Sequence, residues 1–174
     1  QALPQGATVT DTITVTSADG TTSSITITIT GENDGAVITG DSDSITEGGS
    51  LTVSGSVSVS DTDTGEAVFD TDPVVGDHGT LTIDASGNWS YTADGPTVDA
   101  LGDGDTITDT ITVTSADGST GSVVITITGT NDAAIIGGDD SGAVAEDGVT
   151  VVTGALTISD ADAGEGVFNA GTSS

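Results

Sequence analysis

The stretch TDTITVTSADG at residues 10–20 decides the fold, because the same eleven letters return at residues 108–118. The offset between the two copies is 108 − 10 = 98 residues, and ITGEND at 29–34 returns as ITGTND at 127–132 with the same offset. SGSVSVSDTDTGEAVF at 54–69 returns as TGALTISDADAGEGVF at 153–168, one residue further on. A period of about 100 residues is too long for a solenoid or a propeller blade, so it predicts a small domain repeated head to tail.

These offsets divide the chain into three parts. Residues 35–132 form one complete repeat, residues 1–34 match the C-terminal part of a preceding repeat, and residues 133–174 match the N-terminal part of a following one. The chain has no initiator Met, signal peptide or transmembrane run, so we expect it to be internal to a longer polypeptide. Each partial repeat has too little apolar surface for a core of its own. We therefore expect the partial repeats to fray, or to associate end to end between molecules.

Apolar residues alternate with Thr and Ser along nearly the whole chain, which is the pattern of strands with one buried face. No stretch has a helical period, and Asp, Ser and Gly turns separate the strands. About seven short strands per repeat predict an all-β fold, a tandem antiparallel β-sandwich. The bulky side chains expected in the core are Phe69, Trp89, Tyr91 and Leu101. The expected strands lie near residues 36–46, 51–59, 66–70, 79–83, 88–92, 106–115 and 120–129.

The charge balance is extreme, since Lys and Arg number 0 and Asp and Glu number 28, for a formal charge of −28. A chain without cationic side chains is unsuited to nucleic acid or to an anionic membrane surface. Repulsion among so many carboxylates destabilises the compact state unless high salt screens it or divalent cations bind. High net charge is also typical of disordered chains, but the regular alternation of apolar and polar residues argues against disorder here. The chain has no Cys to form disulfides, and its single histidine, His78, reads as a solvated loop residue, so zinc is not expected.

Strand direction gathers the acidic residues at the two ends of the repeat, beside the linkers. The first group is Glu32, Asn33, Asp34, Asp61, Asp63, Glu66 and Asp117, and the second is Glu47, Asp103, Asp105, Asn131 and Asp132, facing Asp160, Asp162 and Glu165 of the following part. Calcium takes six to eight oxygen ligands of these kinds. Asp, Asn and Gly also simply form turns. An Asp-x-Asp-x-Gly-Glu segment beside an Asn-Asp linker, present twice, favours calcium over the turn interpretation.

Three other functions compete with a structural role. Paired carboxylates serve glycoside hydrolases, but those need a cleft with aromatic platforms, and this chain has one Trp and one Tyr, both in strand positions. A glycan-binding module is the second class, but this sequence offers no aromatic cluster on which a sugar could stack. The third class is binding to ice or a mineral surface, suggested by Thr-x-Thr ladders at 25–30 and 106–114, although Thr is common on the solvent face of any strand.

Several motifs fall in an order that resembles the VCBS repeats of bacterial giant adhesins. They are VTDTITVTSADGTTSSITITITGEND at 9–34, TEGG at 46–49, SDTDTGE at 60–66, GTLTIDASGNWSYTAD at 79–94 and DAL at 99–101. These repeats belong among the cadherin-like and immunoglobulin-like extender domains of repeats-in-toxin adhesins. The resemblance covers essentially the whole chain. It implies type I secretion, the surface of a Gram-negative bacterium, and linkers made rigid by Ca²⁺.

The resemblance also implies roles for individual residues. Asn33-Asp34 and Asn131-Asp132 match the linker motif, and Asp61 and Asp63 match the Asp-x-Asp loop. Glu47 matches the Glu that follows the first strand. Asp103 and Asp105 match the acidic loop before the sixth strand, and Asp117 matches the ligand on the last turn. The linkers lack the second Asn and the Pro that are typical of cadherins. We therefore expect a non-catalytic, calcium-rigidified extender segment of a secreted adhesin, with neighbouring repeats of the same polypeptide as its partners.

Overall fold

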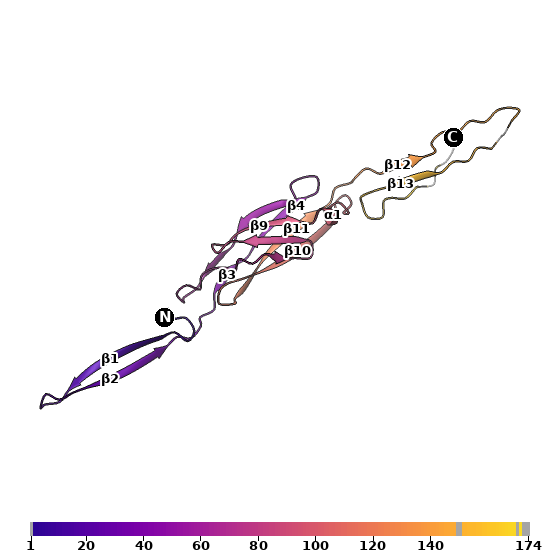
Figure 1. Ribbon diagram of the computed structural model, residues 1–174. Helices are drawn as coiled ribbons and strands as arrows, with labels where there is room; N and C mark the ends of the chain where they lie inside the picture. Colours follow the sequence, from indigo (N-terminus) through magenta and orange to yellow (C-terminus); the bar gives the residue numbers. More distant parts are fainter. Residues whose placement is uncertain (1, 149–150, 170, 172–174) are drawn as a thin grey trace.

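The computed structural model describes residues 2–148, 151–169 and 171, and nearly all of its regular structure is strand. Three parts follow one another along a long axis (Figure 1): an N-terminal hairpin, a central sandwich and a C-terminal strand pair. The hairpin joins β1 (Thr8–Thr16) to β2 (Thr22–Thr30), and the C-terminal pair joins β12 (Ile135–Gly138) to β13 (Leu156–Ser159), both antiparallel.

The central part holds the elements of the sandwich, which confirms the predicted all-β, cadherin-like architecture. They are β3 (Val37–Thr39), β4 (Asp41–Thr46), β5 (Thr52–Ser56), β6 (Ser58–Ser60), β7 (Val74–Val75), β8 (Gly79–Ile83), β9 (Asn88–Ala93), α1 (Gly95–Val98), β10 (Thr106–Thr114) and β11 (Thr120–Thr128). One sheet has the order β10-β11-β4, the facing sheet has the order β5-β9-β8-β7, and β3 pairs with β6. Neighbours are antiparallel except β4, which runs parallel to β11.

The alternation in the sequence becomes the core between the sheets. Ile111 and Val113 of β10 and the inward residues of β11 are buried, and they face Trp89 and Tyr91 of β9. Phe69 is buried with them, as the sequence predicts, and Leu101 packs against the cluster while partly exposed. Burial of each such side chain stabilises the fold by about 1.5–3 kcal/mol. The central repeat therefore has its own apolar core.

The prediction of a strand at residues 66–70 is wrong. The segment is a turn in which Val68 donates to the Glu66 carbonyl, and it makes one isolated bridge, between Phe69 and Ser115. The Phe69 N–H donates to the Ala85 carbonyl, whereas the Asp70 N–H donates to the carbonyl of Thr114 in the other sheet. The backbone therefore crosses between the two sheets and does not continue as a strand of either. Burial of the Phe69 ring accounts for the apolar signal that suggested a strand.

Three smaller differences concern breaks and turns. The expected strand at 36–46 is divided at Gly40, where an added Cβ would lie 2.8 Å from the Ser122 carbonyl oxygen. The expected strand at 51–59 is divided at Val57. Although no helical period is present, the four-residue helix α1 forms after Asp94, with a proline in its first turn. No helix among the described residues has the length and apolar character needed to cross a membrane.

Candidate metal centre

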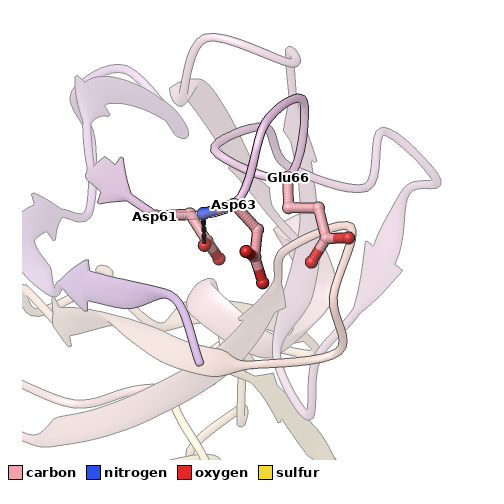
Figure 2. Close-up of side chains that lie close together, drawn as sticks. All are labelled: Asp61, Asp63 and Glu66. Atoms are coloured by element: carbon pink, nitrogen blue, oxygen red, sulfur yellow. Dashed lines mark hydrogen bonds between the residues drawn. The ribbon is translucent and has the colours of Figure 1, made fainter. Parts of the chain in front are cut away.

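The loop after β6 brings three carboxylates together at the end of the sandwich that faces the N-terminal hairpin. Asp61 closes an Asx turn by accepting the Asp63 N–H at 2.7 Å, and Gly65, with φ +91°, turns the chain back so that Glu66 faces them. One oxygen from each of Asp61, Asp63 and Glu66 lies within 4.8 Å of the others. Figure 2 shows the three side chains side by side on this loop.

The three carboxylates leave buried oxygens without a hydrogen-bond donor. Asp63 is only 3% exposed, and Asp61 Oδ2, Asp63 Oδ1 and Glu66 Oε2 accept no hydrogen bond from any described residue. An unsatisfied buried polar group costs about 1–3 kcal/mol, and more when it is charged. Burial raises the pKa of Glu66, and the charges of Asp63, Asp61 and Asp117 raise it further. Since the sequence has no Lys or Arg, the chemistry of this donor set fits a divalent cation.

The cluster is tied to the linker that enters the repeat. Asp34 donates its backbone N–H to Asp63 Oδ2 at 2.8 Å, so the same buried carboxylate serves the cluster and the linker. Thr64 donates its hydroxyl to the Ala2 carbonyl at 2.9 Å, which connects the loop with the N-terminal part. Order in the loop is therefore coupled directly to the position of the linker.

Asp117, on the turn between β10 and β11, holds the linker through hydrogen bonds. Its carboxylate accepts the Ser115 hydroxyl, the Ser119 hydroxyl at 2.7 Å and the Ala36 N–H at 3.0 Å. These donors hold the pKa of Asp117 well below its usual range. A role for Asp117 as a metal ligand stays a prediction. The other two linker residues predicted for this end, Glu32 and Asn33, are exposed.

The second junction, between the sandwich and the C-terminal part, repeats the loop geometry. Asp160 accepts the Asp162 N–H at 3.0 Å, Asp162 Oδ2 accepts the Asp132 N–H at 2.9 Å, and Gly164 has φ +89°. Asp162 is 2% exposed, and its Oδ1 has no donor among the described residues. Each of these features has its counterpart at Asp61, Asp63 and Asp34.

The other residues predicted for the second junction lie around this loop. Glu47 accepts the Thr130 N–H at 2.7 Å, so the linker is held from the sandwich side as well. Asn131 donates its amide to the Asp132 carbonyl. Asp103, Asp105 and Glu165 are exposed, and their role as metal ligands stays a prediction.

Sequence reasoning missed one buried carboxylate, Asp109. It is 1% exposed and accepts hydrogen bonds from the Tyr91 hydroxyl at 2.8 Å and from the backbone N–H groups of His78 and Asp77 at 3.0 and 3.2 Å. Burial and the hydrogen bond to Asp109 raise the pKa of Tyr91. The signal was present, because Asp109 occupies an inward position between Ile107 and Ile111. Its satisfied contacts indicate a structural role.

Comparison with known proteins agrees with the fold. The family model described as bacterial cadherin-like domain matches residues 33–129, a span that contains the entire sandwich core and both loops that reach the first junction. No match was found among curated proteins. The match covers more than half of the chain, and domains of this all-β kind are typically non-catalytic. The chain therefore belongs to the bacterial cadherin-like domain family.

Proposed function

We propose that this chain is a calcium-stiffened extender segment of a secreted bacterial surface adhesin and that it has no catalytic activity. The observation that carries the proposal is the set of buried, donor-free oxygens of Asp61, Asp63 and Glu66 beside the Asp34 linker. In a chain of formal charge −28 without Lys or Arg, a bound cation is the direct way to offset these charges.

Asp61, Asp63 and Glu66 would hold the ion, which would supply positive charge and a common coordination centre for oxygen ligands. Asp63 then acts at two points, because one of its oxygens belongs to the cluster and the other accepts the Asp34 N–H. Fixing the Asp63 side chain therefore restricts the linker. Asp162 accepts the Asp132 N–H in the same way, so the same restriction of the linker applies at the next part of the chain.

An extender is favoured over a ligand-binding module by where the aromatic side chains lie. Trp89 and Tyr91 are both buried in the core, so neither offers a ring for stacking on a sugar. The parts succeed one another along one axis (Figure 1), as a stalk of repeats requires. Neighbouring repeats of the same polypeptide are the proposed partners, and the proposed location is the outer surface of a Gram-negative bacterium after type I secretion.

The test is thermal unfolding of the whole chain with calcium and with a chelator, followed by the fluorescence of Trp89, its single Trp. A ligand that binds only the folded state stabilises it by about 2.7 kcal/mol at a hundredfold excess over Kd. We expect the melting temperature to fall by several degrees on chelation.

The matched control is a second Asp-Thr-Asp segment in the same repeat. Asp61→Asn with Asp63→Asn should abolish most of the calcium effect. Asp70→Asn with Asp72→Asn should leave the effect intact, because these exposed residues share the Asx hydrogen bond but have no buried, donor-free oxygen in the described structure. Equal melting temperatures with and without calcium in the parent chain would refute the proposal.

A further inference from the structure

The turn between β1 and β2 has the hydrogen bonds of the turn between β10 and β11, but no described linker is bound to it. The Thr21 N–H donates to Asp19 Oδ1 at 3.0 Å. The Ser119 N–H donates to Asp117 Oδ1 at the same 3.0 Å, and Asp117 Oδ2 also accepts the Ala36 N–H at 3.0 Å. Asp19 accepts hydrogen bonds only from its own turn among the described residues. The N-terminal turn therefore presents the acceptor with which the equivalent turn binds a linker.

The linker that follows the central repeat presents the complementary donor. By the offset of 98 residues, Ala134 corresponds to Ala36 and Ala133 corresponds to Gly35. The Ala134 N–H has no acceptor among the described residues. An added Cβ at Gly35 would lie 3.6 Å from Ser119 Oγ, whereas a cavity of about 370 Å³ lies open beside Ala133. The space that the turn fills at the first junction is therefore open at the second.

The apolar residues around the turn and the linker are exposed as two matching sets. In the hairpin, the inward residues whose counterparts are buried in the central repeat are 42–51% exposed: Ile13, Val15, Ile25, Ile27 and Ile29. In the C-terminal part, Val144 is 58% exposed, whereas its counterpart Ile45, 99 residues earlier, is 1% exposed. Phe168 is exposed as well, whereas its counterpart Phe69 is buried. Each set thus consists of side chains that form a core in the central repeat.

Only a second molecule can bring these two sets together. The hairpin and the C-terminal part lie at opposite ends of the central sandwich (Figure 1). Within the central repeat the equivalent sets meet because β4 runs parallel to β11, with Ile45 opposite Ile127. Residues 140–145, the counterparts of β4, therefore have their matching edge on β2 of another copy, where Ile29 corresponds to Ile127.

We infer that the β1–β2 hairpin of one molecule docks on the C-terminal part of a second copy: Asp19 accepts the Ala134 N–H, and residues 140–145 add to β2 in parallel. Such a contact joins unlike ends, so it does not close on itself and produces linear filaments. Residues 133–174 contain no counterpart of Trp89 or Tyr91, so the shared core is smaller than the central one. Filament length therefore depends on protein concentration. The contact uses none of the carboxylates of the Asp61 cluster.

Ser23 makes the fit of the two copies imperfect. Its counterpart Gly121 lies so close to Ile38 Cγ2 that there is no room for a Cβ between them. Ile136, the counterpart of Ile38, is exposed, and in the joined copies it faces the Cβ of Ser23. Ser23→Gly restores the space that the central repeat has, so this substitution should tighten the association.

Disulfide trapping tests the contact, since the sequence has no Cys of its own. Chains with Thr21→Cys, at the position of Ser119, are mixed with chains carrying Ala133→Cys, at the position of Gly35, and oxidised gently. The mixed dimer should exceed by about tenfold the dimer formed from Thr12→Cys and Ala133→Cys, because docking raises the effective concentration of the two thiols. Thr12 lies on the solvent face of the hairpin and measures random collision. A chain with both Thr21→Cys and Ala133→Cys should give a ladder of linear oligomers.

Sedimentation of variants without Cys measures the same contact independently. Asp19→Ala should raise the dissociation constant about two- to tenfold, the value of one hydrogen bond. Asp72→Ala removes an exposed carboxylate elsewhere and should not weaken the association. Ser23→Gly should lower the dissociation constant. A mixed disulfide no more abundant than the collision control overturns the inference, as do dissociation constants that neither Asp19→Ala nor Ser23→Gly changes.

Discussion

The hairpins β1–β2 and β10–β11 contain the same eleven residues, yet only one of them is part of a core. Both pair in the same register, with Thr8 opposite Thr30 and Thr106 opposite Thr128. Ile111 is 1% exposed, whereas its counterpart Ile13 is 47% exposed, because no second sheet covers the N-terminal hairpin within the described residues. The local sequence therefore specifies the hairpin and its register, while burial depends on the residues that supply the facing sheet.

The same comparison separates two kinds of carboxylate. Asp109 accepts three hydrogen bonds inside the sandwich, whereas Asp11, at the equivalent place in β1, is exposed. Asp117 holds the linker through Ala36, whereas Asp19 accepts hydrogen bonds only from its own turn among the described residues. Tertiary neighbours therefore decide what each identical Asp contributes.

The largest expected difference is between Ile111→Ala and Ile13→Ala. Removing a buried aliphatic side chain costs about 2–5 kcal/mol, so Ile111→Ala should lower the free energy of unfolding of the central repeat by that amount. Ile13→Ala should change it by less than about 0.5 kcal/mol. Urea unfolding at fixed calcium, followed by Trp89 fluorescence, measures both. Equal losses would mean that the hairpin face is covered in solution.

Asp109→Ala and Asp11→Ala form the next pair. Asp109→Ala leaves the buried Tyr91 hydroxyl and two backbone N–H groups without their acceptor, at about 1–3 kcal/mol for each group that water does not reach. Asp11→Ala should leave the unfolding of the central repeat unchanged, since Asp11 is exposed. Unfolding curves for the two variants, recorded as above, decide the matter. A stable Asp109→Ala protein would show that water replaces the carboxylate.

The fold was largely predictable because its signals are local. Alternation in β10 and β11, and the turns between strands, identified the elements and their directions, and Trp89 and Tyr91 lie in the core as expected. The strand predicted at 66–70 failed because alternation cannot distinguish a ladder from a loop that buries one ring, that of Phe69. The parallel pairing of β4 with β11 is a long-range choice that no local pattern encodes.

For the candidate site, the direction of the strands predicted which loops would lie at the same end of the repeat, but not how each carboxylate would be used. Asp61, Asp63 and Glu66 come together because one short loop carries all three. One of the hydrogen bonds that occupy Asp117 comes from the N–H of Ala36, which is distant in sequence, so this bond could not be foreseen. Asp109 could have been found as a charge among inward-facing residues, since Ile107 and Ile111 flank it.

A smaller effect concerns the uncovered apolar face of the N-terminal hairpin. We expect weak end-to-end association in which residues 133–174 of one molecule pack against residues 1–34 of another. Ile27→Asp places a charge on the apolar face and should raise the dissociation constant about tenfold or more. Thr28→Asp adds the same charge on the solvent face and serves as the control.

Sedimentation equilibrium of the whole chain measures this association. The expected order is parent and Thr28→Asp alike, with Ile27→Asp more dissociated. A parent that remains monomeric at all concentrations would contradict the association. Equal weakening by both variants would assign the effect to charge repulsion alone.

The smallest difference lies in the titration of the two turn carboxylates. Hydrogen bonds from the Ser17 hydroxyl and the Thr21 N–H lower the pKa of Asp19 from 3.8 to about 2. Asp117 accepts the equivalent bonds from Ser115 and Ser119 and an additional one from the Ala36 N–H, so its pKa is depressed further. Because both pKa values are lower in the folded state, the stabilisation is complete above the unfolded value. It is lost as pH falls from 3.8 through the folded values.

Carbon-detected NMR of the Asp carboxyl groups in calcium-free buffer measures both midpoints, and Trp89 fluorescence confirms at each pH that the sandwich is still folded. We expect Asp19 to titrate at about pH 2 and Asp117 only below it. Ser119→Ala removes one donor from Asp117 and should raise its midpoint toward that of Asp19, without affecting Asp19 itself. An Asp117 midpoint at or above that of Asp19 would show that the hydrogen bond from the Ala36 N–H to the Asp117 carboxylate does not persist in solution.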